Sequence, residues 1–455
     1  MEKIKEIIYL PSLRCNLNCQ HCGENQDIAK NDEINSMLVL QQLEASILLE
    51  VPVISISGGE PFLNNTIIQF IIEGIKRTNF KFNITTNGYF TEKIKETIEN
   101  INSSDRDRVS FNISIDGLEN THNKIRRNEH SFEKAIESVT YLVEQGIDTS
   151  INVVVQKDNL NELEELERFF NQISLNIKLN FIPLAIDIAE SGENIYTEEY
   201  QKNIWKRIKT PLEKKIILSK GEYKVKQCHA GQKNIVIGAD GRVYACLTGA
   251  FYKGKEWREK FCLGDLKKSS LDEILFNLPK REEVYNKAVL LCKGCSNPCE
   301  VNREVHLFGQ RSDYSFEEIQ TAFKLEQEGR FGEALLDYFA WHDIEYYGTD
   351  NKLCWSKKLD ASIFVDQKEK NPNKLSISYR KLIPDSKVKI LLNGEEVVCD
   401  NDHTIQKQVV LDISSIKEQY IVITFLVDSL NSPSRCIGNG DFRYLGIGIE
   451  DLKIE

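Results

Sequence analysis

Long apolar runs are missing from this 455-residue chain, and so is any excess of positive charge. No stretch approaches the roughly 20 apolar residues that a membrane-spanning helix needs. The first residues, MEKIKEIIYLPSLRC, lack the apolar core of a secretory signal. The formal net charge is −11, so the composition does not suggest a nucleic-acid-binding surface. We therefore expect a cytoplasmic protein that has no membrane span and binds no nucleic acid.

Cysteine, by contrast, is abundant and unevenly distributed. Nine of the 12 cysteines precede residue 300, and seven of these nine fall in two groups. Because the expected compartment is reducing, disulfides are not favoured there. Clustered thiols in such a chain indicate metal or redox chemistry.

The N-terminal part of the chain, residues 4–185, alternates β-rich runs with helical ones. The expected strands are 4–10, 52–57, 81–86, 109–115, 149–155 and 177–184, and the expected helices lie near 37–50, 66–77, 91–100, 131–145 and 161–173. This order predicts an α/β fold with a parallel sheet built from right-handed βαβ units. Such a sheet places its chemistry at the carboxyl ends of its strands.

The remainder of the chain predicts a change of architecture. A charged helix is expected at 197–218, and one or two helices at 315–340. From 341 onward, short alternating segments and a hairpin turn at Asn393-Gly394 predict an all-β sandwich. We therefore divide the chain into a core at 1–220, a small α+β extension at 221–310, a helical linker at 311–340 and a β-sandwich accessory domain at 341–455.

Three cysteines lie on the loop that follows the first expected strand. The segment LRCNLNCQHC places Cys15, Cys19 and Cys22 within eight residues. Three thiolates at this spacing can bind three irons of a [4Fe-4S] cluster and leave the fourth iron open to a cofactor. The alternative is a structural zinc site in which His21 joins the three cysteines. Structural zinc usually pairs two knuckles, however, and no second half lies nearby.

This cysteine spacing after the first strand of a βα array resembles the radical S-adenosylmethionine (SAM) superfamily. Two further motifs at strand ends agree: Gly58-Gly59-Glu60-Pro61 resembles the GGEP motif, and Ser114 to Arg126 resembles the SxDG…H…R pattern. The resemblance covers about residues 1–185 and implies a partial (β/α)6 TIM-like barrel. The residues that it assigns to SAM are Gly58, Gly59, Glu60, Pro61, Thr86, Asn87, Ser114, Asp116, Arg126, Asn152 and Ile182, and those that it assigns to the SAM-binding cluster are Cys15, Cys19 and Cys22.

The resemblance also implies a reaction. The reduced cluster would pass one electron to the sulfonium of SAM, and the C5′–S bond would break. The 5′-deoxyadenosyl radical would then abstract hydrogen from an unactivated C–H bond, while the protein places the reactants and excludes water. The implied reductant is a flavodoxin- or ferredoxin-type protein.

The second cysteine group can form a closed site with four thiolates. Cys228 and Cys246 enclose an expected hairpin with its turn at Asp240-Gly241, and Cys292 and Cys295 form a C-x2-C knuckle. A zinc ribbon and an iron–sulfur site share this geometry. Behind a radical SAM domain, the layout resembles the SPASM/Twitch extension and implies one auxiliary [4Fe-4S] cluster on these four cysteines. The spacing is similar to that of the aminocyclitol dehydrogenase of butirosin biosynthesis.

The C-terminal part resembles a β domain that is often fused to glycosyltransferases and surface-polysaccharide enzymes. Short motifs such as Asn393-Gly394 and the segment Asp441 to Gly446 carry this resemblance. Two tryptophans in this part, Trp341 and Trp355, can either stack on sugar rings or form the core of the sandwich.

Together these features predict a radical SAM enzyme that dehydrogenates or epimerises a carbohydrate, aminocyclitol or sugar nucleotide. Cys299 either packs in the interior or returns a hydrogen atom to the substrate, which would give inversion. One alternative is a peptide or protein maturase, although a triad that begins at Cys15 leaves no room for a preceding leader-binding domain. Another is a zinc-binding protein without enzymatic activity. We expect substrate contacts from the ends of the fifth and sixth strands, with Lys178, Asn180 and Asp187 as candidates.

Overall fold

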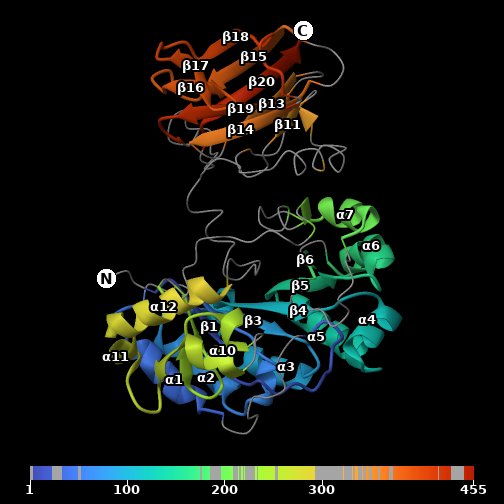
Figure 1. Ribbon diagram of the computed structural model, residues 1–455. Helices are drawn as coiled ribbons and strands as arrows, with labels where there is room; N and C mark the ends of the chain where they lie inside the picture. The colour runs from blue at the N-terminus through green and yellow to red at the C-terminus, as the bar shows by residue number, and fades with distance from the viewer. Residues whose placement is uncertain are drawn as a thin grey trace. The chain divides into compact units, whose positions relative to one another are not determined.

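The chain divides into two compact units in the computed structural model (Figure 1). The first contains Met1–Ile208 and Lys220–Val301, and the second contains Lys209–Ser219 and Asn302–Glu455. The structure describes residues 4–22, 33–49, 53–174, 177–184, 196–208, 214, 217–218, 220, 231–232, 234–251, 255–292, 321, 330–331, 334–336, 341, 345–347, 351–356, 359–367, 372–418, 420–431 and 445–455. None of the helices in this described part has the length and hydrophobicity of a membrane span.

One nine-stranded sheet forms the centre of the first unit, in the order β6-β5-β4-β3-β2-β1-β7-β8-β9. Its first six strands are β1 (Glu6–Tyr9), β2 (Val53–Ile56), β3 (Lys81–Thr86), β4 (Val109–Ser114), β5 (Asp148–Val155) and β6 (Lys178–Pro183). Each pairs in parallel with the next strand along the chain. The expected parallel sheet is therefore confirmed, and its strand order is that of a partial (β/α)6 barrel.

Helices connect these strands and cover one face of the sheet (Figure 1). They are α1 (Ser36–Ala45), α2 (Ile67–Arg77), α3 (Thr91–Glu99), α4 (Glu119–Arg126), α5 (Ser131–Glu144), α6 (Leu163–Ile173) and α7 (Glu198–Trp205), with short 3-10 helices η1 (Pro61–Leu63), η2 (Ser103–Arg108) and η3 (Leu160–Glu162). Helix α2 buries Phe70, Ile71 and Ile75 on one side, the spacing of a single helical face. Helix α4 was not expected from the sequence, since only Ile125 among its eight residues is a buried apolar residue.

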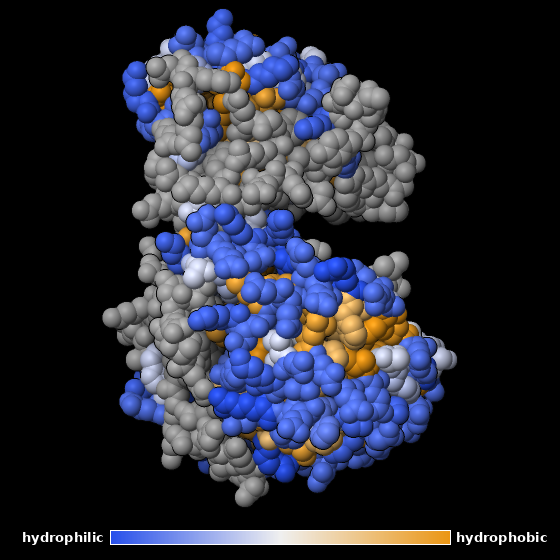
Figure 2. All heavy atoms as spheres, turned by 90° about the vertical axis from the view of Figure 1, so that its right-hand side faces the viewer, coloured by the Kyte–Doolittle hydropathy of each residue, from blue (hydrophilic) through white to orange (hydrophobic). Residues whose placement is uncertain are grey.

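The strands present two different faces. Phe82 on β3 packs against α2 so closely that a Cβ at Gly74 would lie 2.5 Å from its ring, and Ile113 on β4 contacts the backbone around Gly88. Both side chains are fully buried, whereas their neighbours along the strands, Asn83 and Asn112, are only partly buried. Successive side chains of a strand point to opposite faces of the sheet. Phe82 and Ile113 therefore lie on the apolar face that the helices cover, and Asn83 and Asn112 lie on the other face, which is polar. Figure 2 shows hydrophobic residues gathered in one region of this unit's otherwise hydrophilic surface.

The extension adds three strands to the same sheet. These are β7 (Asn234–Ile237), which pairs in parallel with β1, followed by the antiparallel β8 (Arg242–Tyr244) and β9 (Cys262–Asp265). The expected hairpin turns at Gly241, whose φ of 81° suits glycine. The helices of this part are α9 (Leu247–Phe251), α10 (Lys255–Phe261), α11 (Leu271–Phe276) and α12 (Leu278–Cys292). The predicted core and extension thus share one sheet and one compact unit.

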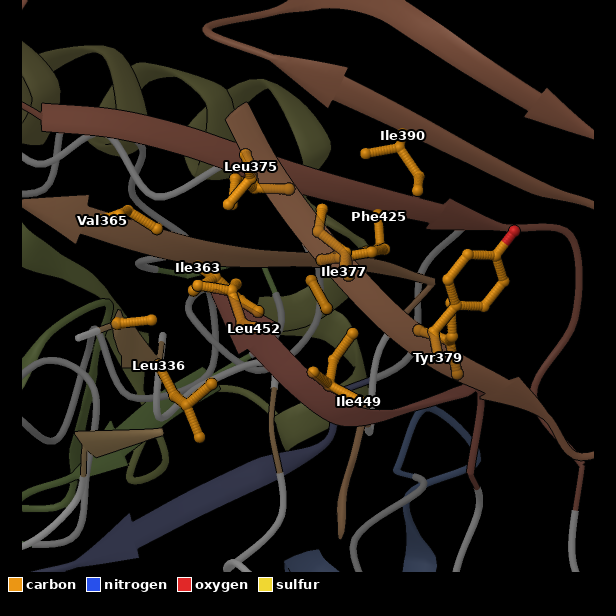
Figure 3. Close-up of a cluster of buried hydrophobic side chains, with 14 of the residues drawn as sticks. Leu336, Ile363, Val365, Leu375, Ile377, Tyr379, Ile390, Phe425, Ile449 and Leu452 are labelled. Carbon is orange, nitrogen blue, oxygen red and sulfur yellow. The ribbon is translucent and has the colours of Figure 1, made fainter. Parts of the chain in front are cut away.

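The second unit is built from two antiparallel sheets. One has the order β10-β11-β14-β19-β16-β17 and the other β12-β13-β20-β15-β18. The strands are β10 (Arg330–Phe331), β11 (Ala334–Leu336), β12 (Glu345–Tyr347), β13 (Asn351–Trp355), β14 (Asp360–Asp366), β15 (Lys374–Lys381), β16 (Val388–Leu392), β17 (Glu395–Asp400), β18 (Gln406–Asp412), β19 (Tyr420–Val427) and β20 (Ile447–Ile454). Side chains from both sheets, including Ile363 and Phe425 of one and Ile377 and Ile449 of the other, form a common core (Figure 3). The expected all-β architecture is confirmed.

Two expectations for this unit need correction. The predicted helical linker at 311–340 is wrong at its end, because β10 and β11 are strands and β11 pairs with β14. The Ala-Leu-Leu segment favours a helix by propensity, but all three residues are buried in the sandwich, and packing outweighs propensity. Trp341 and Trp355 are buried as well, and Trp341 donates its Nε1–H to Ser362 O at 2.8 Å. The structure therefore assigns both to the core and not to sugar stacking.

Candidate active site

The three cysteines of the first group lie on the loop after β1, which is fastened to α4. Gln20 donates its backbone N–H to Ile125 O at 2.9 Å, and its side chain donates to Lys124 O at 3.3 Å. Cys15 and Cys22 are exposed, whereas Cys19 is buried. The loop therefore leaves two thiols accessible and places the third against α4.

A buried ion pair stands behind Cys19. Arg126, at the end of α4, places Nη2 2.7 Å from Asp116 Oδ2 and Nη1 3.6 Å from Cys19 Sγ. The other carboxylate oxygen of Asp116 accepts the backbone N–H of Val154 at 2.9 Å. Both ionic side chains are almost inaccessible to solvent. Asp116 thus links α4, the end of β5 and the cysteine loop.

Two histidines lie beside this buried ion pair. His122 Nδ1 accepts the backbone N–H of Asp116 at 3.1 Å, and His21 Nε2 lies 3.9 Å from Asp116 Oδ2. Burial and the neighbouring Arg126 lower the pKa of His122 to about 3, despite the opposing charge of Asp116. Burial also lowers the pKa of His21. Both imidazoles are therefore neutral near pH 7.

The protonation of these buried side chains depends on burial and on their neighbouring charges. Burial alone would raise the pKa of Asp116, but the charge of Arg126 and the backbone N–H of Val154 hold it below its usual value. Burial would lower the pKa of Arg126, and Asp116 and Cys19 raise it instead. Burial raises the pKa of the Cys19 thiol, and Arg126 opposes that rise. Arg126 is thus a permanent cation that favours the thiolate of Cys19.

The glycine pair after β2 contacts the backbone that leads into the cysteine loop. Gly59 and Glu60 donate their backbone N–H groups to Ser12 O at 2.9 Å and to Arg14 O at 2.8 Å. A Cβ at Gly58 would lie 2.4 Å from Ser12 O, and one at Gly59 would lie 2.3 Å from Arg14 O. Gly58 also has a φ of 126°. Only glycine allows this close approach of two loops.

The carboxylate of Glu60 is fully buried and organises the end of β3. Its Oε1 accepts from Phe62 N at 3.1 Å and from Thr86 Oγ1 at 2.7 Å, and its Oε2 accepts from Asn87 N at 2.9 Å. Burial raises the pKa of Glu60, and these hydrogen bonds oppose that rise. Asn87 in turn donates to Asn16 Oδ1 at 2.9 Å and lies 3.8 Å from Cys15 Sγ. Glu60 therefore positions Asn87 beside the cysteine loop.

The remaining residues assigned to SAM lie at the same edge of the sheet. Pro61 begins η1 and is buried, and Ser114 ends β4. Asn152 pairs with Ser114 across β4 and β5, and Ile182 lies near the end of β6. The structure thus brings the predicted residues to one edge, and their contacts with SAM stay a prediction.

Three contributors were not found by sequence reasoning. Glu33 accepts two hydrogen bonds from the guanidinium of Arg14, both at 2.8 Å. Asn159 is fully buried and donates to Asp116 O at 2.6 Å. Glu162 accepts the backbone N–H of Leu118 at 3.1 Å. Each of these residues fixes a loop through a contact with a segment that is distant in sequence, and no local sequence pattern predicts such a contact.

The residues fit a [4Fe-4S] cluster on the first cysteine group. N–H donors approach two of the three sulfurs, since Leu17 N lies 3.4 Å from Cys15 Sγ and Arg126 lies beside Cys19. Hydrogen bonds of this kind support metal-bound thiolates. Among the described residues, His21 Nδ1 and Arg126 Nε are buried without a hydrogen-bond partner, which suits a site that receives a further group.

The zinc alternative fits less well. His21 Nε2 lies 3.9 Å from Asp116 Oδ2, and the charge of Arg126 also acts on the imidazole. Within the part of the chain that the structure describes, no three His, Cys, Asp or Glu side chains converge as ligands of a single ion. The thiolates of an iron–sulfur cluster bind different irons and need not converge on one point.

The second cysteine group is described only in part. Cys246 follows β8, is buried, and accepts the backbone N–H of Gly249 at 3.4 Å. Cys292 ends α12, but its side chain lies outside the described residues, as do Cys228, Cys295 and Cys299. The assignment of the auxiliary cluster therefore depends on Cys246 and on the sequence spacing. Asp187, a candidate for substrate contact, also lies outside the described residues.

Comparison with known families identifies both parts of the first unit. Residues 9–170 match the family model of the Radical SAM superfamily. The chain carries a radical SAM domain. Residues 228–296 match SPASM, an iron–sulfur cluster-binding domain, and this range contains Cys228, Cys246, Cys292 and Cys295 but ends before Cys299. The cofactors of the protein are accordingly SAM and [4Fe-4S] clusters.

Individual similar proteins differ in the activities that their names state. A probable GTP 3′,8-cyclase of Methanococcus maripaludis is 27% identical over 216 residues, which cover 42% of this chain and 68% of the relative. The structure of Streptococcus suis SuiB bound to precursor peptide SuiA aligns at 16% identity and a TM-score of 0.48, covering 62% of this chain and 66% of that chain. The structure of BtrN in complex with AdoMet and 2-DOIA aligns at 14% identity and a TM-score of 0.33, covering 64% of this chain and 88% of that chain. Both TM-scores lie below 0.5, so neither structure bears on the substrate of the radical SAM domain.

Proposed function

We propose that this radical SAM enzyme dehydrogenates or epimerises a carbohydrate, aminocyclitol or sugar nucleotide. The observation that carries the proposal is the composition of the polar face of β3–β6, opposite the helices, where side chains of Asn, Ser and Thr take the place of most of the branched apolar residues that usually fill a barrel. Neutral donors and acceptors of this kind suit the hydroxyl and amino groups of a sugar or cyclitol.

When bound, SAM and the reduced cluster supply a 5′-deoxyadenosyl radical that abstracts a hydrogen atom from a substrate carbon. Arg126 holds Cys19 against α4 and places a fixed positive charge beside its sulfur. Glu60 holds the ends of β2 and β3 together, and Gly58 and Gly59 let backbone approach backbone there. The residues of this chain therefore bind and orient both cofactors at one edge of the sheet.

The two outcomes differ in the fate of the substrate after hydrogen abstraction. Epimerisation needs a hydrogen atom returned to the same carbon from the opposite side, and we assign that role to the thiol of Cys299. Dehydrogenation instead removes one further electron, which the auxiliary cluster would accept, and a proton from the substrate, and it leaves a carbonyl group. The two outcomes can therefore be distinguished by whether solvent hydrogen enters the product at carbon.

A GTP-type substrate is the second candidate, because several curated relatives of the radical SAM domain are named GTP 3′,8-cyclase or probable GTP 3′,8-cyclase. A triphosphate requires several Lys or Arg contacts. On the polar face of β3–β6 the charged residues are Lys81, Asp148 and Lys178, each at the first position of its strand and far from the carboxyl edge. This charge distribution favours a neutral sugar or cyclitol over GTP.

The test is anaerobic turnover in heavy water with a panel of sugar nucleotides and aminoglycosides. Deuterium retained at carbon in the wild type, and lost in Cys299→Ala, supports epimerisation. A ketone product without deuterium uptake supports dehydrogenation. Cys399→Ala is the matched control, because Cys399 is an exposed cysteine of the second unit. Turnover of a peptide substrate in place of every sugar would contradict the proposal and favour a maturase.

The surroundings of the enzyme follow from the same chemistry. We propose a flavodoxin- or ferredoxin-type reductant and a cytoplasmic location. A reducing compartment of this kind keeps thiols available as cluster ligands. A preparation with about eight irons per chain would match two [4Fe-4S] clusters.

For the β-sandwich we propose an accessory role in glycan metabolism that does not involve Trp341 or Trp355.

A further inference from the structure

Hydrogen bonds join five polar side chains into a ladder across the polar face of β3–β6, opposite the helices. Asn112 donates to Asn83 Oδ1, and Ser150 donates to Asn112 Oδ1. Asn180 then donates to Ser150 Oγ at 3.2 Å and to Asn152 Oδ1 at 3.1 Å. We call these five residues the amide ladder. It runs from the middle of β3 to Asn152, the residue that the family resemblance assigns to the ribose of SAM.

Parallel register brings these residues together. Asn112 on β4 lies opposite Ser150 on β5, and Asn152 lies opposite Asn180 on β6. The ladder is solvated to some degree at every position, and Asn180 is exposed. The neighbouring Ile113 and Ile151 on the helix-covered face are fully buried. The ladder is thus part of an accessible polar surface and not of the packed core.

The ladder leaves hydrogen-bonding capacity unused. Among the hydrogen bonds between described residues, the amide nitrogens of Asn83 and Asn152 donate none, and Asn180 Oδ1 accepts none. A primary amide offers two N–H donors and an oxygen acceptor. Free donors and a free acceptor therefore lie on one surface, and a hydroxyl group can satisfy either kind because it both donates and accepts.

The distribution of charged residues on this face further limits the chemical class of the ligand. Lys81, Asp148 and Lys178 occupy the first positions of β3, β5 and β6, and the ladder-facing residues after them are uncharged. Near the carboxyl edge the same face becomes apolar, where Val154 lies opposite Ile182. On the described strands β3–β6, no cationic side chain lies between these two levels on this face to pair with a phosphate or carboxylate.

We propose that the amide ladder is the substrate-binding surface and that it takes the uncharged polyhydroxylated ring of the substrate, a sugar or a cyclitol. This inference rests on the proposed function and extends it, because it names the residues that select the substrate class. Any phosphate or nucleotide part of the substrate lies off the ladder.

The experiment follows deuterium from substrate carbon into 5′-deoxyadenosine, which reports hydrogen abstraction without knowledge of the product. The probes are myo-inositol, glucosamine and UDP-glucose deuterated at carbon, ribose-deuterated GTP, and a tryptic digest of uniformly deuterated protein. The variants are Asn112→Leu and Asn180→Leu, which keep side-chain size and remove the amide. Asn102→Leu is the matched control, because Asn102 is an exposed asparagine before η2, away from the ladder.

We expect the wild type and Asn102→Leu to take deuterium from at least one of the sugar or cyclitol probes. In the two ladder variants this transfer should fall about tenfold or more, the effect of leaving a bound polar group unpaired. The iron content and the cleavage of SAM without substrate are measured for every variant, and deuterium transfer is expressed per molecule of SAM cleaved. These two readouts show that the variants have folded and loaded their cofactors.

The remaining outcomes separate the two proposals. If the ladder variants transfer deuterium from a sugar as well as the wild type does, the ladder is not the binding surface, while the proposed function stands. If the wild type takes deuterium only from GTP or from the peptide digest, or from none of the probes while it cleaves SAM, both proposals are overturned.

Discussion

The guanidinium of Arg126 lies 2.7 Å from the carboxylate of Asp116, and both groups are shielded from solvent. The same guanidinium lies 3.6 Å from the sulfur of Cys19. One fixed cation therefore lies beside both a buried carboxylate and the sulfur that we propose as a cluster ligand. A buried pair of this kind is costly to break, because the remaining charge has no solvent to stabilise it.

Replacing this cation should affect both stability and the cluster. We expect Arg126→Gln to lower the free energy of unfolding by about 3–5 kcal/mol, since Asp116 is left as an uncompensated buried charge. The midpoint potential of the SAM-binding cluster should become more negative, because a positive charge beside Cys19 favours the reduced cluster. Anaerobic urea unfolding and a redox titration followed by electron paramagnetic resonance measure the two effects.

The matched control for Arg126 is Arg77→Gln on the surface of α2. Arg77 is 41% exposed and pairs with Glu44, so its loss should change stability by no more than about 0.5 kcal/mol. Wild-type stability together with an unchanged potential in Arg126→Gln would refute the role given to this residue.

Close contact between two loops predicts the effect of a single methyl group. In Gly59→Ala the new Cβ would meet Arg14 O at 2.3 Å, so the glycine loop and the cysteine loop must separate. We expect a loss of about 1–3 kcal/mol in stability and a clear loss of iron from the first cluster. Iron analysis and visible absorption after anaerobic reconstitution provide the measurement.

Gly146→Ala is the control for this substitution. Gly146 has a φ of 68°, but nothing lies within 4 Å of its Cβ position. It should lose about 1–2 kcal/mol from backbone strain and keep its full iron content. Equal iron content in both variants would show that loop contact at Gly59 does not govern cluster loading.

Glu60 allows a test of positioning without a change of size. In Glu60→Gln an amide N–H group would face the backbone N–H of Asn87 or the donors on Oε1, so one hydrogen bond becomes a repulsive contact. We expect a loss of about 1–3 kcal/mol in stability and weaker SAM binding, measured by equilibrium dialysis. Glu73→Gln on α2 should behave like the wild type, since Glu73 makes only an ion pair with Lys76 at the surface. Unchanged SAM affinity in Glu60→Gln would contradict its positioning role.

The order of the parallel strands could be predicted because each strand has its own local pattern. The run at 81–86, for example, was expected at the bounds that β3 has, since alternating buried residues such as Phe82 and Ile84 mark a strand. The strand-end motifs were found for a similar reason, because glycines and cysteines are rare enough to be noticed at fixed spacing.

The contacts of the site could not be predicted in this way. Asn112 meets Asn83 and Ser150 only through sheet register, across 29 and 38 residues of sequence. Cys19 and Arg126 are 107 residues apart. Register and helix docking depend on the packing of the whole unit, which single-sequence patterns do not report. At 334–336 the same limitation caused an error, because local helix propensity was overridden by pairing with β14.

His122 gives the structure a pH dependence whose sign can be derived. Its Nδ1 accepts a hydrogen bond from Asp116 N, so the native state requires a neutral imidazole, and burial lowers the pKa of His122 to about 3. In the unfolded chain the pKa returns to about 6.5. Between these values the unfolded state binds a proton that the native state does not. The free energy of unfolding must therefore fall as the pH decreases below 6.5.

The expected size of the effect follows from the same linkage. His122 should account for a loss of about 2 kcal/mol between pH 7 and pH 5. His122→Asn keeps an oxygen acceptor for Asp116 N and removes the titration, so its stability should decrease less over this range. His130→Asn, which replaces an imidazole that is 71% exposed, should follow the wild-type curve. Anaerobic urea unfolding at the two pH values measures all three proteins, and parallel curves for the wild type and His122→Asn would show that His122 is not held neutral by its buried contacts.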